Sequence, residues 1–216
     1  MTFTICTAEQ RSPEWFQSRV GRVTGSKASC VLAVIKSGEA AERRNYRAQL
    51  VVERLTGLPQ GDDFVNDAME WGIQQEANAF AAYEALSGSL VRRTGFLSAT
   101  DQMVGCSLDG DIDNFKGILE LKCPKSATHL EYLKLPIETV PTRHVPQMAH
   151  NLWVSGAEWC DFVSYDPRFP PELQMFCRRY YRDDIAQKSY ELAVSLFLGE
   201  VDRDVADLRK KMAVPA

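Results

Sequence analysis

The sequence predicts a protein of the α/β or α+β class, built on a central mixed β-sheet that is flanked by helices. Residues 1–88 show helical periodicity with capping signals, whereas residues 89–122 change to short alternating stretches separated by glycine. A further helix and two strands follow, before residues 183–212 return to helix. A length of 216 residues with 45% hydrophobic residues fits one domain, 1–216, with an ordinary core.

Each helix of the N-terminal part has a sequence reason for its ends. The first begins at Ser12-Pro13, because serine can cap a helix and proline fits its first turn, and it ends by Gly21. The next three helices are expected at residues 30–35, 40–55 and 67–87, the last of them capped by Asn66 and ended by Gly88. Val23 to Ala28 is expected to be a loop.

The second half alternates between strands and helices. A meander of short strands is expected at residues 89–93, 95–99, 103–107, 111–113 and 117–122. Helices at 126–135 and 142–155, strands at 158–165 and 173–181, and one or two amphipathic helices at 183–212 complete the order.

Composition excludes several classes of protein. The formal net charge of −4 argues against a general nucleic-acid coat, although basic groups can still gather in one channel. No apolar run reaches the roughly 20 residues of a membrane span, and the N-terminus lacks signal-peptide regions, so we expect a cytoplasmic protein without a membrane partner. The six cysteines lack C-x-x-C or zinc spacing, which favours free thiols in a reducing compartment.

A strand that carries Glu120 and Lys122 is the first candidate for a functional site. Side chains two apart in a strand point to the same face, and Asp109 ends a neighbouring strand. Alone, this pair would be a surface ion pair worth under about 1 kcal/mol. Together, the three side chains form a compact place for a metal ion and a base.

Glu76 can add a third carboxylate from the helix at 67–87. The apolar stripe of that helix is expected to comprise Met69, Ile73, Ala77, Phe80 and Tyr83, and Glu76 lies beside it. An inward carboxylate is costly unless it binds a metal or forms a buried salt bridge, and both remain open here. Three carboxylates suit Mg²⁺, and two such ions can clamp an in-line attack on a phosphodiester while Lys122 orients water.

Arg43, Arg44 and Arg47 form a basic cluster on the helix at 40–55. Such a run is usually a solvated face, but it can also contact the backbone of nucleic acid.

Six stretches in order resemble one known family. They are Trp15…Arg19…Val23-Thr-Gly-Ser26, Trp71-Gly-Ile-Gln-Gln-Glu76, Cys106-Ser-Leu-Asp-Gly110, Leu119-Glu-Leu-Lys-Cys-Pro124, Gln147…Trp153 and Tyr165-Asp-Pro-Arg168. The helix-borne Glu, the Asp and the E-x-K pair are similar to the PD-(D/E)-x-K nuclease superfamily. The whole set resembles the phage lambda exonuclease family of alkaline exonucleases, the YqaJ-like viral recombinases.

This resemblance implies a restriction-endonuclease-like core and a Mg²⁺-dependent 5′→3′ exonuclease. Such an enzyme degrades the 5′ strand of linear double-stranded DNA and leaves a 3′ overhang. The resemblance further implies a ring-shaped homotrimer around DNA. It also implies a single-strand DNA annealing protein as the partner in phage-type recombination.

The resemblance also implies roles for individual residues. By this resemblance, Asp109, Glu120 and the Leu121 carbonyl would hold one Mg²⁺, Glu76 would serve a second, and Mn²⁺ would substitute for Mg²⁺. Lys122 would act on the nucleophilic water. Gln147 would support the site, and Arg19, Ser26 and Ser107 would bind the 5′-terminal phosphate. Leu108 departs from the family, which usually has proline before the Asp.

Two other functions fit the same residues. The first is a sequence-specific endonuclease of the same superfamily, which would cut closed circular duplex. The second is a catalytically silent DNA-binding protein. Nucleases of this superfamily that carry an iron–sulfur cluster are disfavoured, because the cysteines here lack the required arrangement.

Overall fold

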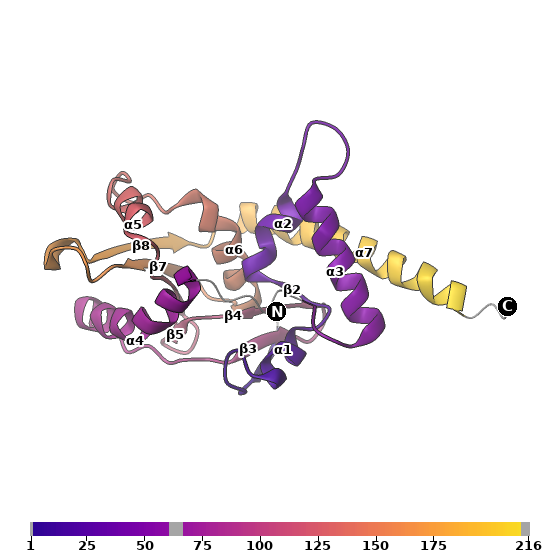
Figure 1. Cartoon of the computed structure of the whole chain (residues 1–216), viewed down its shortest axis with the longest axis horizontal. Coiled ribbons are helices and arrows are strands. Elements are labelled where there is room, and N and C mark those ends of the chain that lie inside the picture. Colours follow the sequence, from indigo (N-terminus) through magenta and orange to yellow (C-terminus); the bar gives the residue numbers. More distant parts are fainter. Residues whose placement is uncertain (1, 61–66, 213–216) are drawn as a thin grey trace.

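The computed structural model describes residues 2–60 and 67–212 and confirms the mixed α/β class, with helices flanking the strands (Figure 1). The strands divide into two four-stranded sheets rather than one. In the first sheet the order is β1 (Phe3–Cys6), β3 (Phe96–Ala99), β4 (Val104–Ser107) and β2 (Val23–Thr24). In the second it is β5 (Gly110–Ile112), β6 (Gly117–Lys122), β7 (Trp159–Tyr165) and β8 (Met175–Tyr181).

Both sheets are mixed. β2 pairs parallel with β4 and β6 pairs parallel with β7, whereas the other ladders are antiparallel. The chain passes from one sheet to the other between β4 and β5, through the buried Leu108 and the half-buried Asp109. The predicted Asp109 therefore lies where the two sheets meet.

Seven α-helices surround the sheets in the described residues. They are α1 (Pro13–Arg19), α2 (Ala28–Leu32), α3 (Ala41–Thr56), α4 (Asp67–Ser87), α5 (Ser126–Leu133), α6 (Val145–Ser155) and α7 (Asp184–Met212). α6 packs against β4 and α7, α4 packs against β6, and α5 packs against β7 and β8. α3 and α7 lie side by side, and α7 extends beyond the sheets (Figure 1). No helix in the ranges described has the length and hydropathy of a membrane span.

The predicted helix ends are largely confirmed. The Ser12 hydroxyl accepts a hydrogen bond from the backbone N–H of Trp15 at 3.2 Å, with Pro13 in the first turn. Gly57 and Gly156 end α3 and α6 in the left-handed region, at φ 70° and 76°. The tail is one helix, α7. The predicted cap Asn66 lies outside the described residues.

Several predicted elements were wrong. Residues 89–93 form no strand, only an isolated bridge between Arg92 and Asp111. β1 and β2 were missed, because such short strands depend on their partners β3 and β4 more than on their own sequence. The helix expected at 30–35 lies at 28–32 instead.

The predicted stripe of α4 was also partly wrong. Ile73 and Ala77 are exposed, whereas Ala79, Phe80 and Tyr83 are buried. The Met69 side chain lies outside the described part of the chain. The smaller core cluster is formed by Ala79, Phe80 and Tyr83 of α4, and Trp71 packs partly against it.

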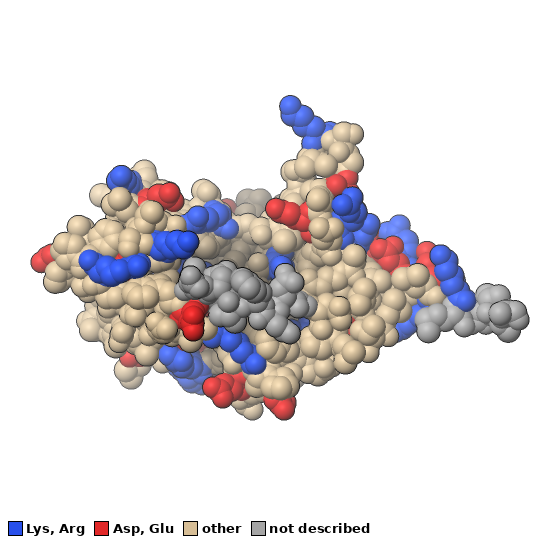
Figure 2. Space-filling view, viewed as in Figure 1, with Lys and Arg blue, Asp and Glu red and all other residues tan. Residues whose placement is uncertain are grey.

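Charged side chains are distributed unevenly over the surface. Figure 2 shows Lys and Arg gathered over the end of the molecule that carries α5, β7 and β8. Near α7, Arg43 pairs with Glu39 at 2.7 Å and with Glu200 at 2.8 Å, and Arg47 pairs with Glu200 at 3.1 Å. These pairs favour the structural interpretation of the cluster over DNA contact, since the guanidinium groups already have partners. Arg44 is exposed.

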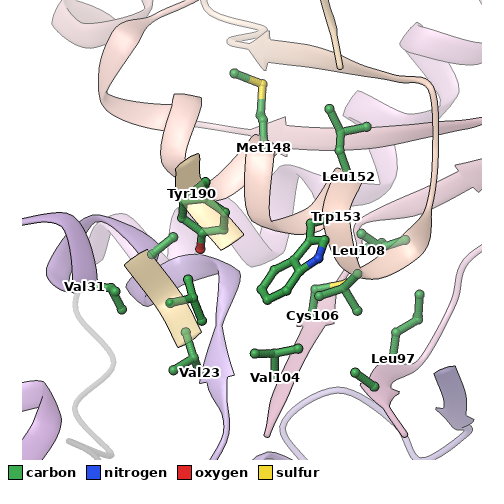
Figure 3. Packing of buried hydrophobic residues seen from close by; sticks show 14 of the residues in the cluster. Val23, Val31, Leu97, Val104, Cys106, Leu108, Met148, Leu152, Trp153 and Tyr190 are labelled. Carbon is green, nitrogen blue, oxygen red and sulfur yellow. The ribbon is translucent and has the colours of Figure 1, made fainter. Parts of the chain in front are cut away.

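Two hydrophobic clusters form the core. The larger one joins both sheets to α3, α6 and α7, and Trp153, Tyr190, Val104 and Cys106 meet in it (Figure 3). The smaller one lies between α4 and the second sheet and includes Phe80. All six cysteines are free, as predicted.

His150 connects three elements inside the larger cluster. Its Nδ1 lies 2.7 Å from the Tyr190 hydroxyl on α7, and its Nε2 lies 2.9 Å from the Gly105 carbonyl oxygen in β4. A carbonyl only accepts, so Nε2 carries the proton and Nδ1 accepts from the tyrosine. Burial lowers the pKa of His150 to about 4.

We predict that this histidine makes the fold sensitive to acid. The unfolded chain binds a proton near pH 6.5, whereas native His150 stays neutral down to about pH 4. Stability should therefore fall as the pH is lowered from 6.5 to 4, by up to about 3 kcal/mol from this residue. Urea unfolding of wild type and His150→Gln across this window measures it. Equal pH slopes in the two proteins would contradict the assignment.

Candidate active site

Asp109 is fixed beside β6 by a backbone hydrogen bond. The Leu121 N–H donates to Asp109 Oδ2 at 2.6 Å. Because β5 and β6 pair antiparallel with Gly110 opposite Leu119, the residue just before Gly110 faces the end of β6. Asp109 is thereby held next to Glu120 and Lys122, as the sequence predicted.

Glu120 is buried and has partners on both carboxylate oxygens. Its side chain is 1% exposed, Oε1 contacts the ammonium of Lys122, and Oε2 accepts a hydrogen bond from Asn151 Nδ2 at 3.1 Å. Leu119 and Leu121 point to the opposite face, into the smaller core cluster. The alternation predicted for this strand is confirmed.

The three side chains at this junction shift one another's pKa. Burial raises the pKa of Glu120 to about 7, with Asp109 adding to the rise and Lys122 opposing it. Burial also raises the pKa of Asp109, against the effect of Lys122 and of the Leu121 N–H. Burial alone would lower the pKa of Lys122, but the two carboxylates hold it above its usual value. Ionising both carboxylates here leaves one buried negative charge, which a cation can compensate.

Glu76, on α4, lines a cavity that Asp109 and Lys122 also line. The cavity has a volume of about 380 Å³ and is lined by Glu76, Asp109, Leu121 and Lys122, among others. Glu76 is half-buried, and its Oε1 lies 3.3 Å from Arg93 Nη1. The sequence left a buried salt bridge open as an alternative; the structure shows instead a partly exposed ion pair, and the carboxylate also lines the cavity.

The donor atoms fit a hard divalent cation by their chemistry. Three carboxylates and a backbone carbonyl are oxygen ligands of the kind that Mg²⁺ prefers. In the residues described, no three His, Cys, Asp or Glu side chains are already gathered as a ligand set. Binding of a second ion by Glu76 would therefore exchange its Arg93 partner for the metal.

Arg19 and Ser107 come together at the end of β4. Arg19 Nη1 donates to Ser107 Oγ at 3.1 Å, and the guanidinium lies 4.1 Å from the centre of the Trp15 ring. Thr24 of β2 pairs parallel with Gly105 of β4, so Ser26 and Ser107, each two residues further on, leave the sheet at the same edge. Ser26 is exposed there, and no hydrogen bond joins it to Arg19.

Residues 14–158 match the model of the YqaJ-like viral recombinase domain. The chain belongs to the YqaJ-like viral recombinase family. No curated protein matches. The structural comparison agrees with the family: LHK-Exo, an alkaline exonuclease from Laribacter hongkongensis, is 36% identical, with 94% of this chain and 98% of that chain covered.

Two crystal structures of LHK-Exo match this fold, at TM-score 0.83 for its complex with dAMP and 0.82 for the other. A phage-related exonuclease from Haemophilus somnus shares the fold at TM-score 0.65 and 14% identity, with 87% of this chain and 96% of that chain covered. The family assignment thus agrees with the resemblance in the six sequence stretches.

Some residues of this YqaJ-like site were not assigned by the sequence. Asn151, which holds Glu120, lies one helical turn after Gln147, while Gln147 itself is half-buried and has no hydrogen bond to the site carboxylates. Asn151 follows Gln147 by four residues, so the two side chains share one face of α6, and this spacing was the sequence signal that could have found Asn151. Arg93 was missed because it lies in the segment 89–93, which was predicted to be a strand but is irregular.

Asn151 also joins the two parts of this site. A Cβ atom at Gly25 would lie 2.2 Å from Asn151 Oδ1, so only glycine allows this approach. The turn that carries Ser26 therefore packs directly on the side chain that holds Glu120.

Proposed function

We propose that this protein is a Mg²⁺-dependent 5′→3′ exonuclease that acts on the ends of linear double-stranded DNA. Its product would be a 3′ single-stranded overhang for annealing recombination. One observation supports this most: Ser107, which Arg19 contacts, lies two residues from Asp109 on the same stretch of chain. An anion site of this kind next to a carboxylate site fits an enzyme that starts from a terminal phosphate.

Each side chain has a role in this proposal. Asp109, Glu120 and the Leu121 carbonyl would hold one Mg²⁺, and Glu76 a second. Bound Mg²⁺ supplies charge stabilisation at the scissile phosphate and lowers the pKa of water. Lys122, which contacts Glu120, would orient the attacking water.

The asymmetry of the site sets the polarity of the reaction. Burial lowers the pKa of Arg19, but a guanidinium remains charged in proteins and can hold a terminal phosphate with the help of Ser107 and Ser26. The 5′ nucleotide would then lie over the first sheet and the scissile phosphate over the sheet junction. Mn²⁺ is expected to replace Mg²⁺, because both accept the same oxygen ligands.

We further propose a homotrimeric ring that works with a single-strand DNA annealing protein in the cytoplasm. A groove between the segment after α2 and helix α7 exposes Val34, Ile35 and Leu196, at 89%, 56% and 61%. Apolar side chains exposed together are typical of protein contact surfaces.

We predict that light scattering of the purified protein gives three times the chain mass of 24.3 kDa. A ring needs contacts that persist on dilution, so the mass should stay constant as the protein concentration is lowered. A stable monomer would contradict the ring.

A second prediction tests the active site and the reaction together. Wild type should degrade end-labelled, 5′-phosphorylated linear duplex with Mg²⁺ and stop when a chelator is added. Asp109→Ala and Lys122→Ala should lose roughly 10²–10⁴-fold in rate, because ligand and water-orienting groups act on the transition state. Circular dichroism should show both variants folded.

The same assay separates the alternatives. Cutting of covalently closed circular duplex would indicate an endonuclease, and no degradation with Mg²⁺ or Mn²⁺ would indicate a silent DNA-binding protein. Full activity in either variant would exclude the proposed site.

A third prediction concerns Arg19. Loss of a charge-assisted hydrogen bond costs about 1.5–3 kcal/mol, so Arg19→Ala should reduce the preference for 5′-phosphate over 5′-hydroxyl ends roughly tenfold or more. Rates on 5′-hydroxyl duplex are the internal control and should change little. An unchanged preference would refute the phosphate pocket.

A further inference from the structure

A cluster of three side chains lines the same cavity as Glu76. Tyr132 comes from α5, and Arg143 and His144 come from the 3₁₀ turn Thr142–His144 that precedes α6. Arg143 Nε donates to the Tyr132 hydroxyl oxygen at 2.8 Å, and its Nη2 contacts the same oxygen. The His144 Nε2 lies 2.9 Å from that oxygen. Neither the family resemblance nor the proposed reaction gives this cluster a role.

The hydrogen bonds of the cluster fix the position of the guanidinium. Arginine only donates, so the Tyr132 oxygen accepts from Arg143 and its own proton goes to His144 Nε2. That arrangement requires a neutral His144, which agrees with a pKa lowered to about 4 by burial and by Lys122 and Arg143. Tyr132 is 4% exposed and packs on Phe162, so the anchor is rigid.

Arg143 nevertheless remains available to a ligand. The residue is exposed, and within the described ranges it makes no ion pair with a carboxylate. Nearby arginines differ, since Arg93 pairs with Glu76 and Arg168 pairs with Asp166 at 2.7 Å. A rigidly held guanidinium without a carboxylate partner is suited to bind a phosphate group.

The location of the cluster indicates which phosphate. Tyr132 and His144 pack on Phe162 of β7, in the second sheet, whereas Arg19 and Ser107 belong to the edge of the first sheet. Asp109 and Glu120 lie at the junction between them. A strand whose 5′ end is at Arg19 and whose scissile phosphate is at Asp109 continues toward Arg143.

We propose that Arg143, held by Tyr132 and His144, binds the phosphate next to the scissile one on its 3′ side in the degraded strand. This inference rests on the proposed exonuclease function. Arg143 is thus a substrate-binding residue that holds the DNA remaining on the enzyme after each nucleotide leaves.

Single-turnover release of the first nucleotide tests the contact. The substrate is a 5′-phosphorylated linear duplex, either unmodified or with an uncharged methylphosphonate at the linkage 3′ to the scissile one. Wild type, Arg143→Ala and the control Arg203→Ala, an exposed arginine on α7, are compared on both. The modification should slow wild type and Arg203→Ala roughly tenfold or more, since a charge-assisted hydrogen bond is lost.

The decisive result is the coupling between protein and DNA changes. Arg143→Ala should be slowed about as much as wild type is by the methylphosphonate, and the methylphosphonate should then add less than about twofold. Tyr132→Phe, which keeps the ring and the arginine but removes the anchor, should lie between wild type and Arg143→Ala. A methylphosphonate several linkages further along should slow all variants equally.

Three outcomes would overturn the inference. Effects of Arg143→Ala and of the methylphosphonate that multiply would place the contact elsewhere while leaving the exonuclease function intact. Full activity of Arg143→Ala would likewise show that Arg143 does not bind this phosphate, and it would leave the exonuclease function intact. Wild type that leaves unmodified duplex intact would overturn the proposed function itself. If Arg143→Ala melts below the assay temperature, Arg143→Gln replaces it, and the same coupling decides.

Discussion

The site depends on one backbone hydrogen bond, from the Leu121 N–H to Asp109 Oδ2. The chain changes sheets between β4 and β5, where Leu108 is buried in the larger core cluster and the Asp109 side chain is held by this hydrogen bond. The bond holds Asp109 beside the C-terminal end of β6, where Glu120 and Lys122 point to one face.

Burial makes the charge of Glu120 depend on its neighbouring side chains. Glu120 is almost fully enclosed, so its charge depends on Lys122 and on the amide of Asn151. On the opposite face of the same strand, leucines pack against α4 and fix the strand in place. The site side chains and the core side chains thus lie on opposite faces of the same six-residue strand, because successive side chains of a strand alternate between its faces.

The sequence predicts those parts of the site that follow from local periodicity and from turns. Asp109, Glu120 and Lys122 meet as expected, because strand alternation and a Gly-bounded turn are local properties. The division into two sheets, the edge strand β1 and the pairing of Arg93 with Glu76 were not predictable in this way. They depend on which segments distant in the sequence come together, and an isolated sequence carries no measure of that.

The close approach of Gly25 to Asn151 has a consequence for which substitutions this chain can tolerate. The turn with Ser26 and the support of Glu120 share one van der Waals contact, in which even a methyl group finds no room. A side chain larger than glycine at position 25 would displace the Asn151 amide, and with it the hydrogen bond to Glu120. The turn that carries Ser26 and the position of the Glu120 carboxylate are therefore mechanically coupled through Asn151.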